Sequence, residues 1–219
     1  MNKENIKNNI CYIVLTCEKF IETRVKWQND TFFKNVDKKD VYFISSVSHT
    51  DSNIYGWNTA DNYESCPMKY ICFFKNMLLD YEWYCFIDDD TFIHTNNLNK
   101  FLQNYNSSDP LYIGKLCNNY NPPFYMSGGA GFILSKPVYL HLLNYIRCNT
   151  IEELCKSIYG DLSIGLWLKN SENNFNIVKI DNEHFNSNIH TDESNLTEFI
   201  SFHYLKTFEE FEFYNKLKI

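Results

Sequence analysis

The chain has 219 residues, enough for one large domain or two small ones. Its hydrophobic residues (44%) and aromatic residues (17%) suffice for a sizeable core, which excludes a disordered chain. The formal net charge is −7 and Lys and Arg form no cluster, which argues against a nucleic-acid-binding protein and means that bound phosphates would need a metal ion.

The first nine residues (MNKENIKNN) are polar and form a predicted tail, residues 1–9, before a single folded domain, residues 10–219. The tail contains no apolar signal-peptide core. No stretch of the sequence reaches the ~18–20 apolar residues of a membrane span. The sequence as it stands predicts a soluble, cytoplasmic protein, unless the chain was trimmed from a longer precursor.

The domain opens with a β-α-β pattern. Residues 10–16 (ICYIVLT) are almost continuously apolar, which is typical of a parallel strand buried on both faces. A helix is predicted over about residues 19–29, and a second buried strand over residues 41–46. This order is typical of the start of a doubly wound α/β sheet.

A polar stretch, residues 47–63, is predicted to be a surface loop. Residues 64–81 are predicted to form one long helix, with Pro67 tolerated in its first turn. The pattern favours a core-facing stripe over a cofactor site for the apolar residues at helical spacing, which are Tyr70, Phe73, Phe74, Met77 and Leu78.

Three consecutive carboxylates, Asp88, Asp89 and Asp90, follow a strand-like run at residues 83–87 (WYCFI). Like charges this close repel, so a half-buried strand end holds them only with a cation. Carboxylate oxygens at such a place suit Mg²⁺ or Mn²⁺ that is also bound by phosphate oxygens. A solvated turn is the alternative, and this stretch by itself favours neither.

A helix (residues 96–105), a strand (residues 111–116) and a loop lead to a cluster of glycines at residues 128–131, GGAG. Glycines gathered in this way indicate positive φ angles or a close backbone approach. A phosphate-binding loop would open a helix, whereas the FIL that follows is strand-like. The cluster is either a sharp bend packed against a bound substrate or a tight structural turn.

Helices are predicted over residues 136–147 and 160–168, and Asp161 is the one acidic residue in the second. It lies at the helix start, where it caps the helix or faces a cleft, and the pattern alone favours a cap. Strands are predicted over residues 176–180 and 199–204, before an acidic C-terminal helix. The histidines of this part of the chain are His184 and His190, in a polar loop, and His203, for which a core role is the simplest interpretation.

None of the eight cysteines forms a CxxC pair, which argues against a zinc cluster. Several lie in apolar stretches, as buried free thiols do. A disulfide framework of a secreted protein is the alternative.

Four blocks of sequence, in order, resemble glycosyltransferase family 31, the fringe-like and core 1 β1,3-galactosyltransferase-like enzymes. They are DDDTF at residues 88–92, YMSGGAGFILS at 125–135, DLSIG at 161–165 and SFHY at 201–204. Weaker matches lie at Lys69 and at residues 24–27. The resemblance covers about residues 10–205, and four ordered blocks are far more specific than a single DxD motif.

The resemblance implies a GT-A fold: a single mixed, mostly parallel sheet flanked by helices. Its donor-binding half would span about residues 10–116 and its acceptor-binding half about residues 117–219. It further implies a UDP-sugar donor, a divalent metal (Mn²⁺ or Mg²⁺), and inverting transfer to a glycan or glycoprotein acceptor with a β1,3 linkage.

Carried over block by block, the resemblance makes Asp90 and His203 the metal ligands and Asp161 the general base. One base suffices, because inversion is a single displacement by an acceptor hydroxyl. The residues expected to bind the donor are Thr16, Arg24, Lys69, Asp88, Asp89, Gly128, Gly129, Ala130 and Gly131.

The sequence departs from the family pattern at Gly160, where relatives often have an acid before the base, and it predicts neither the N-terminal anchor nor the stem that relatives usually carry. A trimmed catalytic domain would belong in the Golgi lumen. Two other functions remain open: a catalytically inactive carbohydrate-binding relative, and a metal-dependent phosphohydrolase that uses the three aspartates.

Overall fold

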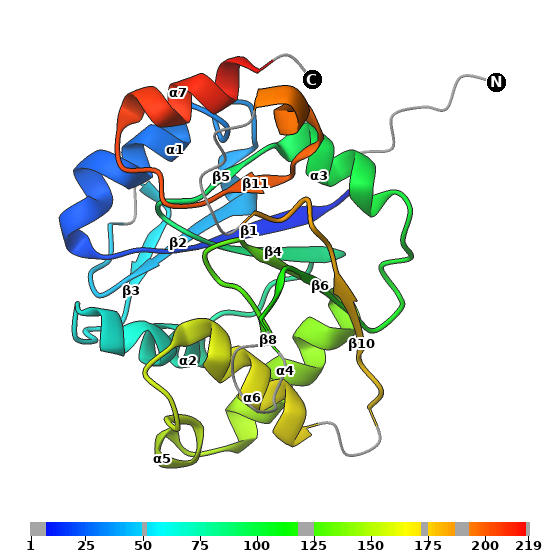
Figure 1. The fold of residues 1–219 in the computed structure, drawn as a ribbon. Coiled ribbons are helices and arrows are strands. Elements are labelled where there is room, and N and C mark those ends of the chain that lie inside the picture. Colours follow the sequence, from blue (N-terminus) through cyan, green and yellow to red (C-terminus); the bar gives the residue numbers. More distant parts are fainter. Residues whose placement is uncertain (1–7, 50–51, 118–124, 172–174, 187–192, 218–219) are drawn as a thin grey trace.

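The computed structural model describes residues 8–49, 52–117, 125–171, 175–186 and 193–217. A seven-stranded sheet runs through the middle of the molecule, in the order β10-β6-β9-β4-β1-β2-β3 (Figure 1). The strands of this sheet are β1 (Ile10–Leu15), β2 (Val41–Ser45), β3 (Ile54–Gly56), β4 (Trp83–Asp88), β6 (Leu111–Gly114), β9 (Phe132–Ser135) and β10 (Val178–Asp181).

Only β9 runs antiparallel to its neighbours in this sheet, β4 and β6, and the other strand pairs are parallel. The expectation of a mixed, mostly parallel sheet is therefore confirmed. Two short antiparallel pairs accompany it: β5 (Phe92–Ile93) with β11 (Ser201–Phe202), and β7 (Leu116–Cys117) with β8 (Tyr125–Met126).

Helices cover both faces of the sheet (Figure 1). On one side lie α1 (Lys26–Asp30), α3 (Thr95–Leu102) and α7 (Phe208–Lys216). On the other lie α2 (Cys66–Asn76), α4 (Lys136–Cys148) and α6 (Gly160–Ser171), with the short α5 (Ile151–Leu154) beyond them. None of the helices in the described part of the chain combines the length and the apolar character that crossing a membrane requires.

The apolar residues of β1 contribute to two hydrophobic cores, because side chains alternate between the two faces of a strand. Ile10, Tyr12 and Val14 join the core beneath α3 and α7. Cys11 and Ile13 join the core beneath α2, α4 and α6. This arrangement explains why the strand is apolar at nearly every position.

Several predicted boundaries were wrong. The predicted loop at residues 47–63 contains β3, which pairs in parallel with β2. The helix predicted over residues 19–29 is a 3₁₀ turn (Glu18–Phe20), a π-helical segment (Ile21–Val25) and α1 in succession. The strand predicted over residues 199–204 is reduced to β11, which lies outside the main sheet because it pairs with β5.

The long helix predicted over residues 64–81 ends at Asn76, and Met77 is already extended. Leu78, predicted to face the core, is 71% exposed. The Tyr84 hydroxyl explains the early end: it accepts a hydrogen bond from Tyr81 N (3.0 Å) and donates one to Leu79 O (2.9 Å). These bonds hold a turn that brings the chain back to the start of β4.

All eight cysteines are free thiols in the structure. Cys11 and Cys85 are buried, as expected for thiols in apolar strands. Cys148 and Cys155 are exposed, so the expectation of burial does not extend to them.

Candidate active site

The site lies at the carboxyl ends of β1 and β4, which are adjacent parallel strands. Leu15 and Asp88 are paired in the register, so Thr16 and the three aspartates leave the same edge of the sheet. Asp89 N donates to Leu15 O (3.1 Å) and extends the pairing of β4 with β1, and Thr91 N donates to Asp88 O (3.2 Å) and closes the turn after β4. Ligands of open α/β sheets bind at this edge, where loops at the carboxyl ends of the strands diverge.

Gln28 holds the backbone of the aspartate turn. Its side chain is fully buried, and Nε2 donates to the carbonyl oxygens of Asp88 (3.1 Å), Asp89 (3.1 Å) and Thr91 (3.0 Å). Gln28 was not predicted from the sequence, since a glutamine in a short helix carries no local signal for this role. Only the packing of α1 against the end of β4 reveals it.

The Asp89 carboxylate is hydrogen-bonded to two other side chains. It accepts hydrogen bonds from Thr16 Oγ1 (2.8 Å) and from Arg24 Nη1 (2.7 Å). Burial raises the pKa of Asp89, while the Arg24 charge and these hydrogen bonds lower it. Arg24 lies in the π-helical segment, an irregularity frequent at functional sites, and its guanidinium covers the Phe20 ring at 3.9 Å.

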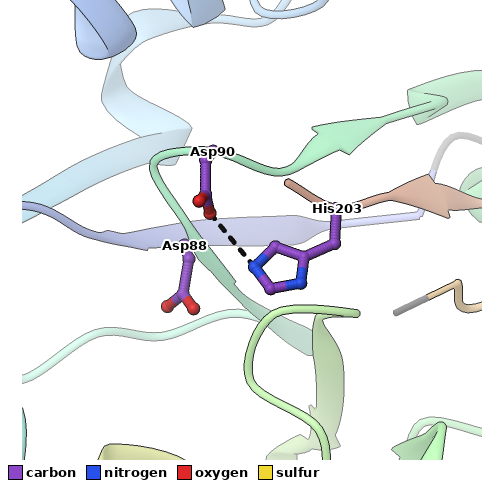
Figure 2. Close-up of side chains that lie close together, drawn as sticks. All are labelled: Asp88, Asp90 and His203. Atoms are coloured by element: carbon purple, nitrogen blue, oxygen red, sulfur yellow. Dashed lines mark ion pairs between the residues drawn. The ribbon is translucent and has the colours of Figure 1, made fainter. Parts of the chain in front are cut away.

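Asp88, Asp90 and His203 form a second group, in which one ligand atom from each side chain lies within 4.8 Å of the others. Figure 2 shows the three side chains converging from the end of β4, the turn after it and the segment after β11. His203 Nε2 lies 3.2 Å from Asp90 Oδ1. The pairing of β11 with β5 and the hydrogen bond from Leu205 N to Asp90 O (3.0 Å) bring His203 to this place.

This group fits a divalent cation. Burial raises the pKa of Asp88, and the neighbouring carboxylates of Asp90, Asp161 and Asp89 raise it further. A bound dication would offset that repulsion. The donor set of two carboxylates and one imidazole suits Mn²⁺. Nδ1 of His203 is buried with no hydrogen-bond partner, so this imidazole has a ring nitrogen that no protein group occupies.

Residues 128–131 form a tight turn into β9, which is one of the two alternatives that the sequence left open. Gly131 N donates to Gly128 O (2.9 Å), and Gly131 has a φ of 81°. A Cβ at position 129 would overlap the His203 ring, so glycine is required there. The Thr91 hydroxyl donates to Gly129 O (2.8 Å), which ties this turn to the aspartate turn. The turn therefore packs against the candidate metal ligand, and its contact with a substrate stays a prediction.

Asp161 is the second residue of α6, and its carboxylate joins that helix to the glycine turn. Oδ2 accepts from Gly128 N (2.9 Å) and Oδ1 from Leu162 N (2.8 Å). An N-cap would accept from an N–H two or three positions further along, so the cap interpretation is wrong for Asp161. Burial raises its pKa, against the effect of these hydrogen bonds.

Two glycines of α6, Gly160 directly before Asp161 and Gly165 four residues after it, allow close packing. A Cβ at Gly160 would lie 2.8 Å from Tyr70 Cε2, so an acidic residue would not fit between α6 and α2. A Cβ at Gly165 would lie 2.5 Å from Tyr125 Cβ, in β8. The departure from the family pattern at Gly160 therefore has a steric cause.

Lys69 is 2% exposed, and its Nζ donates to Thr16 O (2.9 Å) and to Asp61 Oδ1 (2.8 Å). Asp61 also accepts from Glu18 N (2.8 Å). Lys69 thus ties the end of β1 to a neighbouring loop, and a contact between Lys69 and a donor stays a prediction.

Two further histidines of the C-terminal region, His184 and His190, were candidate site residues. His184 supports β11 through its carbonyl, which accepts from Ile200 N (2.8 Å), and it does not join the metal-ligating group. His190 lies outside the described residues. Tyr204, which was not predicted from the sequence, has a φ of 68°, is 49% exposed and stacks on the His203 ring, with the ring centroids 3.8 Å apart.

Replacing His203 by alanine is expected to lower the affinity for Mn²⁺ by at least ~10-fold, the smallest loss typical even for a residue that only supports a metal ligand, because one of three ligands is lost while both carboxylates remain. The measurement is a Mn²⁺ titration in the presence of UDP. His49→Ala, at an exposed histidine, is the control and should leave the affinity unchanged. An unchanged affinity in His203→Ala would make His203 a packing residue.

Residues 6–212 match the family described as Fringe-like. The chain is 32% identical over 127 residues to glycoprotein-N-acetylgalactosamine 3-beta-galactosyltransferase 1 of Xenopus laevis, which covers 56% of this chain and 35% of that protein. It is 24% identical over 158 residues to beta-1,3-N-acetylglucosaminyltransferase lunatic fringe of Xenopus laevis, in an alignment that covers 62% of this chain and 42% of that protein. The chain thus spans well under half the length of these curated relatives.

Solved glycosyltransferases share the fold. The chain aligns with GlyE of Streptococcus pneumoniae at a TM-score of 0.52 and 10% identity, over 96% of this chain and 61% of that one. It aligns with an active-site variant of LgtC at a TM-score of 0.50 and 10% identity, over 93% and 94%. At these identities the likeness concerns the fold alone, and it confirms the GT-A fold expected from the sequence.

Proposed function

The chain belongs to the Fringe-like family, and on that premise we propose that it is a metal-dependent, inverting glycosyltransferase. It moves a hexose or an N-acetylhexosamine from a UDP-sugar to a glycan or glycoprotein acceptor and forms a β1,3 linkage. The observation that carries the proposal is the convergence of Asp88, Asp90 and His203 at the edge of the sheet, with Asp161 electrostatically coupled to Asp88.

The metal group would assist the departure of UDP as the leaving group. A divalent cation there would neutralise the charge that builds on the diphosphate as the sugar leaves. The nearby cations Arg24 and Lys69 bring no uncompensated positive charge to the diphosphate, since Arg24 is paired with Asp89 and Lys69 with Asp61. The chain as a whole carries a net charge of −7, with 20 Lys and Arg against 27 Asp and Glu.

Asp161 acts as the base that takes the proton from the acceptor hydroxyl. Its hydrogen bonds to Gly128 N and Leu162 N fix the carboxylate in one orientation. Burial raises its pKa, which makes the carboxylate a stronger base than an exposed aspartate. The donor sugar and the acceptor then border the glycine turn, beside the metal group.

The donor-binding half, about residues 10–116, supplies Thr16, Arg24, Lys69, Asp88 and Asp89 around the nucleotide. The acceptor-binding half, about residues 117–219, supplies the glycine turn and the base. A phosphohydrolase with two metals would need a further cluster of ligands, and the described residues contain one such group.

A thermal-shift panel of UDP-sugars tests the proposal. With Mn²⁺, the donor sugar at about 100 times its Kd adds ~2.7 kcal/mol of stability, a rise of several degrees in Tm. EDTA should abolish the rise, and the sugar that gives the largest rise should be hydrolysed slowly when no acceptor is present. A panel in which no UDP-sugar raises the Tm in a Mn²⁺-dependent way would overturn the proposed function. Donor binding without hydrolysis or transfer would favour the inactive relative.

A further inference from the structure

Two exposed tyrosines, Tyr63 and Tyr159, meet beside the candidate active site. Their ring centroids lie 6.1 Å apart, and the ring planes are inclined by 73° in an edge-to-face contact. Tyr63 is 69% exposed and Tyr159 is 37% exposed, so most of the Tyr63 ring lacks protein cover. Neither tyrosine belongs to the metal group, the glycine turn or the set of residues expected to bind the donor.

The packing of two helix starts brings these rings together. Tyr63 begins a 3₁₀ turn, Tyr63–Ser65, that leads into α2, and Tyr159 directly precedes α6. At Gly160 a Cβ would lie 3.3 Å from Cys66 Cβ, so the starts of α2 and α6 touch. Asp161 is two residues beyond Tyr159, and the hydrogen bond from Ser163 Oγ to Tyr159 O (2.8 Å) fixes the backbone between them.

The Tyr63 hydroxyl lies within electrostatic reach of the site. Partial burial of this group, together with the charges of Asp161 and Asp88, raises the pKa of Tyr63 to about 12. The hydroxyl therefore stays protonated at neutral pH and is able to donate a hydrogen bond. The pair thus offers two aromatic surfaces and a hydroxyl donor on the same side as the base.

This combination suits a sugar ring. The C–H face of a pyranose packs on an aromatic face, and its hydroxyl groups need donors and acceptors at the edge of that face. We propose that Tyr63 and Tyr159 bind the acceptor sugar, whose attacking hydroxyl is then presented to Asp161. The inference rests on the proposed function and adds to it the residues that would hold the acceptor.

The experiment measures binding, so that it does not depend on turnover. Wild-type protein and variants are titrated, in the presence of UDP and Mn²⁺, with a panel of p-nitrophenyl glycosides of common hexoses and N-acetylhexosamines. Tyr63→Ala and Tyr159→Ala should each weaken binding of the best glycoside by ~10-fold, as expected for the loss of a central aromatic contact. Tyr63→Phe, which keeps the ring, should recover most of that loss. UDP affinity should stay unchanged in all three.

Phe213→Ala is the matched control, because Phe213 is 44% exposed and makes a similar edge contact with Tyr214 on α7. Unchanged glycoside binding in both alanine variants would limit the tyrosines to joining α2 and α6 and would overturn the inference. Wild-type protein that binds none of the glycosides would overturn it as well. Failure of the wild type to bind UDP with Mn²⁺ would instead overturn the proposed function, and loss of glycoside binding in the alanine variants would still support the acceptor site.

Discussion

Asp161→Asn is expected to lower the rate of sugar transfer by ~10²–10⁴-fold, the contribution of a positioned general base. UDP and Mn²⁺ should bind as in the wild type, because Asp161 lies outside the metal group. An asparagine carbonyl still accepts a hydrogen bond from the N–H of either Gly128 or Leu162, so the glycine turn should keep its position. Single-turnover transfer to an acceptor is the measurement, alongside a UDP titration.

The pH dependence gives a second test of the same residue. A base must be deprotonated, so the transfer rate should rise with pH through the raised pKa of Asp161 and level off above it. The asparagine variant should lack this rise. Asp80→Asn, at an 84% exposed side chain, is the matched control and should behave as the wild type. Near wild-type transfer by Asp161→Asn would mean that another group is the base.

Asp90→Asn is expected to abolish Mn²⁺-dependent binding of UDP, with a loss in metal affinity of at least ~100-fold. Asp90 is central to the group: it is paired with His203 at 3.2 Å, and its Oδ2 lies 3.7 Å from Arg24 Nη1. The neutral amide removes one of two carboxylate ligands, and transfer should fall with metal binding. Calorimetric titration of Mn²⁺ with and without UDP measures the change.

The same Asp80→Asn variant serves as control for the loss of one aspartate charge. If Asp90→Asn still binds UDP in a Mn²⁺-dependent way, Asp90 is not a ligand and the metal group must be redefined. A loss of UDP binding that is equal with and without Mn²⁺ would instead indicate damage to the aspartate turn, which Leu205 N and Gln28 hold through backbone carbonyls.

Local patterns led to correct expectations where the physics is local. The apolar runs of β1 and β4 predicted buried strands, because a strand covered on both faces is apolar at successive positions and these short runs are rich in β-branched and aromatic residues. A local pattern gave a wrong prediction at residues 77–81, which were expected to continue the helix α2. Their apolar side chains continue the helical spacing of α2, and the turn held by the Tyr84 hydroxyl leaves no trace in that spacing.

The sequence by itself determined the sheet strands other than β3, the acidic edge after β4 and the family blocks, since run length, side-chain alternation and residue order are properties of neighbouring positions. Only the tertiary structure decided which side chains meet. The pairing of β11 with β5 brings His203 to Asp90, the packing of α1 brings Gln28 to the aspartate turn, and the contact of α6 with α2 requires Gly160. Such contacts depend on how distant segments pack, because short-range periodicity specifies the face that a residue occupies and not the partner it finds there.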